Sequence, residues 1–202
     1  PATGQETFWK DVVDGDGKVT GREKTFNINE ATQYEIGDAL PDVTGGLRTS
    51  FRWKNFDFML AAAYQIGGRQ WDGNSANVYD PGRAGFVASQ DLVGNTWTPE
   101  HTNAKFPKLM FNGTWNFVRS NCDYLYRDAS YFSLKTINVG YTLPKRWTSK
   151  ICIESLRVFF AADNLYFTSA HTGFDPRTAY TGQNAFGFPQ AKTFTFGITM
   201  NL

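Results

Sequence analysis

The segment 192–202 (KTFTFGITMNL) limits the possible folds more than any other part of the sequence. Its large apolar residues alternate without a break with small or polar ones. In a β-strand successive side chains point to opposite faces, so this strand has one apolar face and one polar face. Its length is close to the roughly 9–11 residues that a tilted strand needs to cross a bilayer. Taken alone, it fits a membrane β-barrel and a soluble β-sandwich equally well.

Four further segments alternate in the same way, and we predict strands near 44–53, 56–67, 131–143 and 155–167. In the first of them, Arg48 and Arg52 share the face opposite to the apolar residues. At the start of the third, Phe132 and Leu134 are out of phase with the residues that follow. Either a β-bulge or a part of the strand that stands above the membrane explains this break in the pattern.

The connections between the predicted strands alternate between long and short. The long ones are 11–42, 68–128 and 168–191, and the short ones are 54–55 and 144–154. Transmembrane barrels show this alternation between outer loops and periplasmic turns, whereas a soluble sandwich has no reason to do so. The polar strand face is then predicted to line a hydrated lumen, with Arg48, Arg52, Asp57 and Arg157 facing it.

Five strands are too few for a complete membrane barrel. The smallest such barrels have eight strands, and five would leave two open edges in the hydrocarbon region. The sequence has no apolar run long enough for a transmembrane helix, and its first residues (PATGQETFWK) lack the pattern of a signal peptide. We therefore expect an all-β chain that contributes to a larger transmembrane antiparallel β-barrel.

The segment 11–23 (DVVDGDGKVTGRE) is the most site-like local motif. Counted as a calcium loop, Asp14, Asp16 and Glu23 occupy positions three, five and twelve. The first position is Val12 instead of an acid, and Lys18 places a positive charge beside the carboxylates. Asp-Gly-Asp-Gly is also common turn chemistry. A calcium ion at Asp14, Asp16 and Glu23 and a solvated turn both stay open.

Other classes of function find little support in the sequence. Only two histidines are present, and no Gly-x-Ser-x-Gly or phosphate-cradling glycine motif occurs, so catalysis is not expected. The net charge of +1, with Lys and Arg scattered singly, argues against nucleic-acid binding. Cys122 and Cys152 lack the spacing of a metal or redox site, so no cofactor is expected apart from calcium. A soluble β-sandwich that binds carbohydrate through loop aromatics remains the alternative.

Several signatures, in order along nearly the whole chain, carry a family resemblance. They are 37–51 (GDALPDVTGGLRTSF), 53–57 (WKNFD), 97–100 (WTPE), 131–145, 155–165, 173–176 (GFDP) and 188–194. Together they closely resemble the C-terminal part of SusC/RagA-type TonB-dependent outer-membrane transporters. Two departures from the family are the Val inserted in its acidic Asp-Asn-Gly-Asp-Gly loop and the terminal Leu202, where an aromatic residue is usual.

This resemblance implies a barrel of roughly 22 strands, with this chain supplying about the last five and the plug domain and TonB-interacting segment lying outside it. It also implies import of a glycan, oligosaccharide or peptide across the outer membrane of a Gram-negative bacterium. A SusD-like surface lipoprotein and the TonB complex would be the partners. Aromatic faces and a nearby acid in the outer loops suit sugar or peptide ligands, and the candidates are Trp71, Tyr79, Trp97, Phe174, Asp175 and Tyr180.

Overall fold

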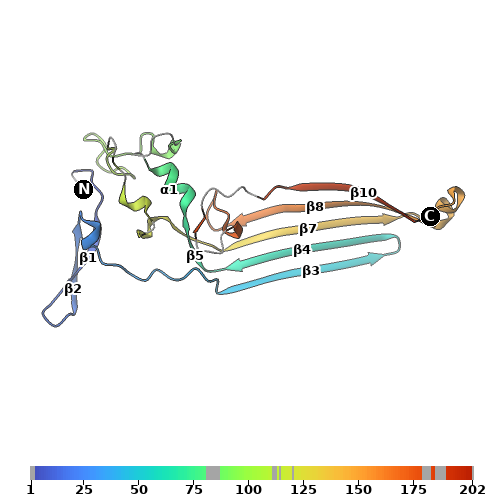
Figure 1. Ribbon diagram of the computed structural model, residues 1–202, viewed down its shortest axis with the longest axis horizontal. Coiled ribbons are helices and arrows are strands. Elements are labelled where there is room, and N and C mark those ends of the chain that lie inside the picture. Colours follow the sequence, from blue (N-terminus) through green and yellow to red (C-terminus); the bar gives the residue numbers. More distant parts are fainter. Residues whose placement is uncertain are drawn as a thin grey trace. The chain divides into compact units, whose positions relative to one another are not determined.

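The computed structural model describes residues 3–80, 87–110, 113, 115–119, 121–178, 183–184 and 190–201. Strands dominate these residues, and none of their helices is both long and apolar enough to span a membrane (Figure 1). The chain divides into two compact units. The aromatic unit comprises residues 1–37, 71–126 and 183–186, and the sheet unit comprises 38–70, 127–182 and 187–202.

The sheet unit is built on one five-stranded antiparallel sheet with the strand order β10-β8-β7-β4-β3 (Figure 1). Its strands are β3 (Val43–Trp53), β4 (Phe56–Ile66), β7 (Tyr131–Thr142), β8 (Ser155–Ser169) and β10 (Thr193–Asn201). They lie where the alternation of apolar residues predicted strands, and each end differs from the prediction by at most two residues.

Two short connections lie at the same end of this sheet, because all its neighbouring strands are antiparallel. Lys54 and Asn55 join β3 to β4, and Lys54 adopts the left-handed region with φ of 53°. The helix α2 (Lys145–Thr148) and a 3-10 turn (Ser149–Ile151) join β7 to β8. Cys152 follows this turn as an exposed, free thiol with φ of 56°.

A β-bulge interrupts β7. The register between β4 and β7 shifts so that Lys135 has no paired residue on β4. The register between β7 and β8 shifts at the same place, between Leu134 and Thr136, and Asn164 of β8 adopts a left-handed φ of 52° there. The bulge moves Phe132 and Leu134 back onto the apolar face, so it is the correct one of the two explanations that the sequence left open.

The two faces of the sheet differ sharply in chemistry. Cross-strand pairing places the large apolar side chains of all five strands on one face. Fifteen of these are exposed, and they are Val43, Leu47, Phe51, Trp53, Phe56, Tyr64, Ile66, Phe132, Val139, Val158, Tyr166, Phe194, Phe196, Ile198 and Met200. An exposed apolar surface of this extent marks an interaction surface. The opposite face carries mostly polar, charged and small residues, together with Met59, Phe159 and Phe167.

The aromatic unit contains short elements. The hairpin of β1 (Phe8–Val13) and β2 (Val19–Thr25) lies partly within 11–42, where the sequence predicted a loop. The other elements are the 3-10 turns Ile28–Glu30, Gln90–Leu92, Asn116–Val118 and Asp123–Leu125, the helix α1 (Gly73–Tyr79) and the strand β9 (Gln183–Asn184), while the strands β5 (Arg69–Asp72) and β6 (Tyr126–Asp128) each include residues of both units. β5 and β9 pair in parallel through Trp71 and Asp72.

Buried aromatic residues hold this unit together. Its core consists of Ala76, Leu92, Phe106, Trp115, Phe117, Val118 and Leu125. The ring of Trp115 stacks on Phe106 and Phe117 with centroid distances of 6.1 and 5.3 Å, and its indole N–H donates to the Lys108 carbonyl at 3.2 Å. Segment 68–128, expected to be a patternless loop, therefore folds around aromatic contacts that have no sequence period.

Candidate functional site

A hydrogen-bonded charge cluster lies on the polar face of the sheet, toward the end with the short connections. Arg157 of β8 donates through Nε and Nη2 to the two carboxylate oxygens of Asp57 on β4, at 2.9 and 2.5 Å. The same Nη2 donates to the amide oxygen of Asn138 on β7 at 3.2 Å. A bidentate arginine–carboxylate pair is both stronger and more directional than a single contact. The cluster therefore ties three strands together through side chains.

Two glycines make room for the side chains of this cluster. A Cβ atom at Gly140 would lie 2.3 Å from Nη2 of Arg157, so only glycine lets this arginine cross β7 to reach Asp57. A Cβ atom at Gly197 would lie 2.3 Å from the ring of Phe159. The guanidinium of Arg157 in turn lies 5.1 Å from the centre of the Phe159 ring. Both glycines permit large side chains to lie flat along the sheet.

Arg52 lies beside this cluster without joining it. It pairs with Asp57 across β3 and β4, but within the described part of the chain its guanidinium has no hydrogen-bond or ion-pair partner. A hollow of about 420 Å³ adjoins it. Arg48, on the same strand face, contacts Met59 with 3.2 Å between Nη2 and Sδ. The four residues predicted to face a lumen thus share one face, and their lumen-facing role stays a prediction.

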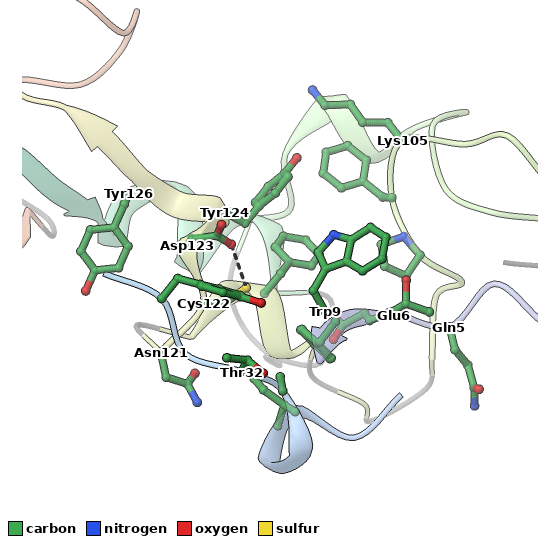
Figure 2. A pocket seen from close by; sticks show the side chains of 18 of the residues that line it. Gln5, Glu6, Trp9, Thr32, Lys105, Asn121, Cys122, Asp123, Tyr124 and Tyr126 are labelled. Atoms are coloured by element: carbon green, nitrogen blue, oxygen red, sulfur yellow. Dashed lines mark hydrogen bonds between the residues drawn. The ribbon is translucent and has the colours of Figure 1, made fainter. Parts of the chain in front are cut away.

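A larger cavity, of about 850 Å³, lies within the aromatic unit (Figure 2). Its volume falls within the range of roughly 300–1,000 Å³ that is typical of small-molecule sites. Aromatic and polar side chains mix in its lining, among them Glu6, Trp9, Thr32, Trp97, Lys105, Phe106, Asn121, Asp123, Tyr124 and Tyr126. Such a lining suits a ligand that offers both apolar faces and hydrogen-bonding groups.

Glu6 fixes one wall of this cavity. Its two carboxylate oxygens accept hydrogen bonds from the backbone N–H of Asn116 at 2.8 and 2.9 Å. Burial raises the pKa of Glu6, although hydrogen bonds from Asn116 and Phe117 act in the opposite direction. Burial also raises the pKa of the Cys122 thiol, which lies 3.9 Å from a carboxylate oxygen of Asp123 (Figure 2). Cys122 is therefore a protonated thiol at neutral pH.

The structure separates the aromatic residues that were predicted to bind ligand. Trp71 and Tyr79 pack against the buried core of the aromatic unit. The hydroxyl of Tyr79 donates to Asp91 at 2.9 Å, and burial together with this hydrogen bond raises the pKa of Tyr79. Trp97 lines the cavity, and its indole nitrogen is buried with no partner among the described residues. Of these three residues, Trp97 is the one placed to meet a ligand.

Phe174 and Asp175 belong to the sheet unit. The Phe174 side chain is 2% exposed. Asp175 accepts hydrogen bonds from Arg177 at 2.8 and 2.6 Å, and Arg177 also donates to Ser133 at 3.1 Å. Burial acts to raise the pKa of Asp175, but the hydrogen bonds and charge of Arg177 outweigh it and lower the pKa overall. Both residues thus have structural contacts, while Tyr180 lies outside the described residues.

The acidic residues of the hairpin turn are directed to different partners. Asp14 accepts hydrogen bonds from the backbone N–H groups of Asp16 and Lys18 at 3.1 and 2.9 Å, while the carboxylate of Glu23 lies 3.5 Å from the Lys10 amine. Within the described ranges, no three His, Cys, Asp or Glu residues are grouped so as to hold a metal ion. The structure therefore does not bring Asp14, Asp16 and Glu23 together, and calcium binding stays a prediction.

Sequence reasoning missed Gly140, Asn138 and Glu6, which shape these sites. A glycine inside an alternating strand signals the close approach of another group, so Gly140 carried a usable signal. Asn138 shares its strand face with Gly140, which the period of two also predicts. Glu6 lies 110 residues before its partner Asn116 and carried no local signal.

Solved structures with a similar fold cover nearly the whole chain. The chain is similar to the structure of the RagAB peptide transporter, with a TM-score of 0.76 and 21% identity over 96% of this chain and 22% of that one. For the RagAB peptide importer in its "closed-closed" state, the TM-score is 0.78 and the identity 23%, over 98% and 21% of the two chains. At these identities the likeness establishes the fold alone.

Curated proteins are also similar to the chain, although no protein-family model matches it. TonB-dependent receptor P3 of Formosa agariphila is 28% identical over 199 residues, which cover 93% of this chain and 18% of that protein. TonB-dependent receptor SusC of Bacteroides thetaiotaomicron is 25% identical over 200 residues, or 95% and 19%. The chain thus spans about a fifth of these relatives, which are named as receptors and not as enzymes. The resemblance to the C-terminal part of SusC/RagA-type TonB-dependent transporters is confirmed.

Proposed function

We propose that this chain forms part of a transmembrane β-barrel of roughly 22 strands in the outer membrane of a Gram-negative bacterium. One observation carries the proposal, namely the opposition of the two sheet faces. Phe196 and Ile198 on the apolar face are 80% and 70% exposed, while the opposite face holds the ion pair of Arg157 and Asp57. Lipid suits the first face, and the second needs a hydrated lumen. A soluble carbohydrate-binding sandwich is not favoured, because it would have to cover the apolar face.

The edges of the sheet imply the rest of the barrel. β3 and β10 are the outermost strands, so the backbone groups on their outer sides are unpaired within the described sheet. Unpaired edges are not tolerated in hydrocarbon, so further strands of the same transporter would pair with both of them. The plug domain and the segment that contacts the TonB complex would lie in that remaining part.

The barrel would import a glycan, oligosaccharide or peptide in a TonB-dependent manner, together with a SusD-like surface lipoprotein. Two findings support this part of the proposal. The relatives include a receptor named SusC, and the similar solved structures are of a peptide importer named RagAB. The cavity lined by Trp97 offers aromatic and polar groups to such a ligand. In this arrangement the two short connections of the sheet face the periplasm, and 11–42, 68–128 and 168–191 lie outside the cell.

Shortening segment 68–128 in the full-length transporter tests the proposal. We expect a barrel that still assembles in the outer membrane but loses lipoprotein association, ligand uptake or both, because this segment holds most of the aromatic core and much of the cavity wall. Heat-modifiable mobility on gels reports barrel assembly, and pull-down and uptake assays report the other two. Unchanged association and uptake in an assembled barrel would remove the segment from the import pathway.

A further inference from the structure

The hollow beside Arg52 is unusually rich in cations for the face of a membrane strand. It adjoins the side chains of Arg52 and Arg157, with Asp57 as its only acid. Lys54 also lines it, but the amine of Lys54 is held 5.0 Å from the centre of the Trp53 ring. Three cations and one acid line the hollow, so its side chains carry a surplus of two positive charges, and Arg52 is the cation with neither an ion-pair nor an aromatic partner among the described residues.

The carboxylate of Asp57 is already engaged by Arg157. Both oxygens of Asp57 already accept hydrogen bonds from Arg157. Arg157 also donates to Asn138, and its guanidinium occupies the room that Gly140 leaves by lacking a Cβ atom. Arg52 is the cross-strand partner of Asp57, yet it lies beyond ion-pair distance of that residue. Arginines of membrane proteins normally pair with an acid or face a water-filled space, so the exposed fork of Arg52 is available to a carboxylate that reaches the lumen.

We propose that this hollow is a carboxylate-binding site, with the planar fork of Arg52 as the principal ligand. A guanidinium binds a carboxylate through two parallel hydrogen bonds, as Arg157 already does with Asp57 a few ångströms away. Thr142 and Asn55 line the same hollow and supply additional hydrogen-bonding side chains.

The carboxylate has two possible sources with the same chemistry. It is either an acidic side chain from another part of the same transporter or the carboxylate of a solute in the lumen. This inference rests on the proposed function, because it needs the polar face to line a lumen. The two sources predict different behaviour of the purified protein.

The test compares Arg52→Gln with Arg48→Gln in the full-length transporter, purified in detergent. Arg48 is a matched control, because it lies on the same strand and the same face, and among the described residues its guanidinium donates to the thioether of Met59 and has no ion pair. Melting temperatures are measured in sodium chloride and in sodium acetate at equal ionic strength, with acetate as the carboxylate probe. A third variant, Arg52→Lys, keeps the charge but removes the fork.

If the carboxylate is a side chain of the transporter, Arg52→Gln should melt at a lower temperature than both wild type and Arg48→Gln, and this difference should be present in sodium chloride. If the carboxylate belongs to a solute, acetate should raise the melting temperature of wild type and of Arg48→Gln. Arg52→Gln should not show this rise. In that case we also expect about a tenfold weaker midpoint for acetate in Arg52→Lys, the effect of losing one charge-assisted hydrogen bond.

Equal behaviour of Arg52→Gln and Arg48→Gln in both salts would overturn the carboxylate site. Neither measurement depends on transport. Uptake assays on the same proteins therefore judge the import function separately, and failure of one conclusion is distinguishable from failure of the other.

Discussion

The sheet unit and the aromatic unit differ in how the sequence determines their folds. In the sheet unit, every strand follows a two-residue alternation, and backbone pairing repeats it across five strands. In the aromatic unit, order depends on a few rings that meet from distant places, such as Phe106, Trp115 and Phe117. Many weak and repeated strand-pairing interactions stabilise the sheet unit, whereas a few large aromatic contacts stabilise the aromatic unit. Single substitutions should therefore affect the two units very differently.

Trp115→Ala is expected to have the largest effect. The side chain is 1% exposed and stacks between two other rings, so its removal should destabilise the aromatic unit by about 3–5 kcal/mol. Hydrogen exchange of the full-length transporter should show lost protection in 71–126 and intact protection in β3, β4, β7, β8 and β10. Val93→Ala, at a side chain that is 77% exposed, is the control. Equal loss of protection in both units would contradict the proposed difference in how the two units are stabilised.

Gly140→Ala should produce an effect of intermediate size in the sheet unit. The added methyl group displaces Arg157 from Asp57 and should cost about 1–3 kcal/mol, a typical penalty for overpacking. The strands should remain paired, because the backbone ladder does not depend on this cluster. In the Arg157→Ala background the same substitution should cost much less, since the clash is gone. Chemical unfolding of the four proteins of this cycle measures the coupling, and additive effects would count against the packing described.

The stability of the two units should respond to pH in opposite directions. The pKa of Glu6 is raised above 4.5 in the folded state, so the aromatic unit loses stability as pH rises from about 4.5 through that raised value. The pKa of Asp175 is lowered below 3.8, so the sheet unit loses stability as pH falls from about 3.8 through that lowered value. Hydrogen exchange at several pH values follows both units at once. Glu6→Gln should abolish the first trend and leave the second, and retention of both trends would exclude Glu6 as the cause.

The smallest effect is expected at the β1–β2 turn. Asp14→Ala removes an acceptor for two backbone N–H groups and should cost roughly 0.5–2 kcal/mol locally, by analogy with the loss of a helix N-cap. Calcium binding at Asp14 and Asp16 remains a proposal for this turn. Proteolysis of the hairpin with and without a chelator tests it. Protection by calcium in wild type but not in Asp14→Ala would establish the ion, and equal cleavage would leave the turn held by Asp14 alone.

The contrast between the units also explains what the sequence could predict. The alternation in segments such as 192–202 has a fixed period, so strands, faces and the shared face of Arg52 and Asp57 follow from it directly. The aromatic core has no period, because its members come from loops, turns and a short helix. The spacing of residues in the sequence could not predict that segment 68–128 is folded. Nor could it predict that Glu6 and Asn116 together form one wall of the larger cavity. Of the proposed ligand residues, the side-chain chemistry was predictable, whereas the burial of Phe174 was not.

The position of Cys152 offers an intrinsic reporter of orientation. This thiol is free and exposed on the short β7–β8 connection, while Cys122 is half-buried and its pKa is raised by burial. A maleimide reagent should therefore modify Cys152 much faster than Cys122 at neutral pH. If the connection faces the periplasm, a reagent that cannot cross the outer membrane would reach Cys152 only after that membrane is made permeable. Within this part of the chain, the native sequence thus carries its own probe of sidedness, without any engineered cysteine.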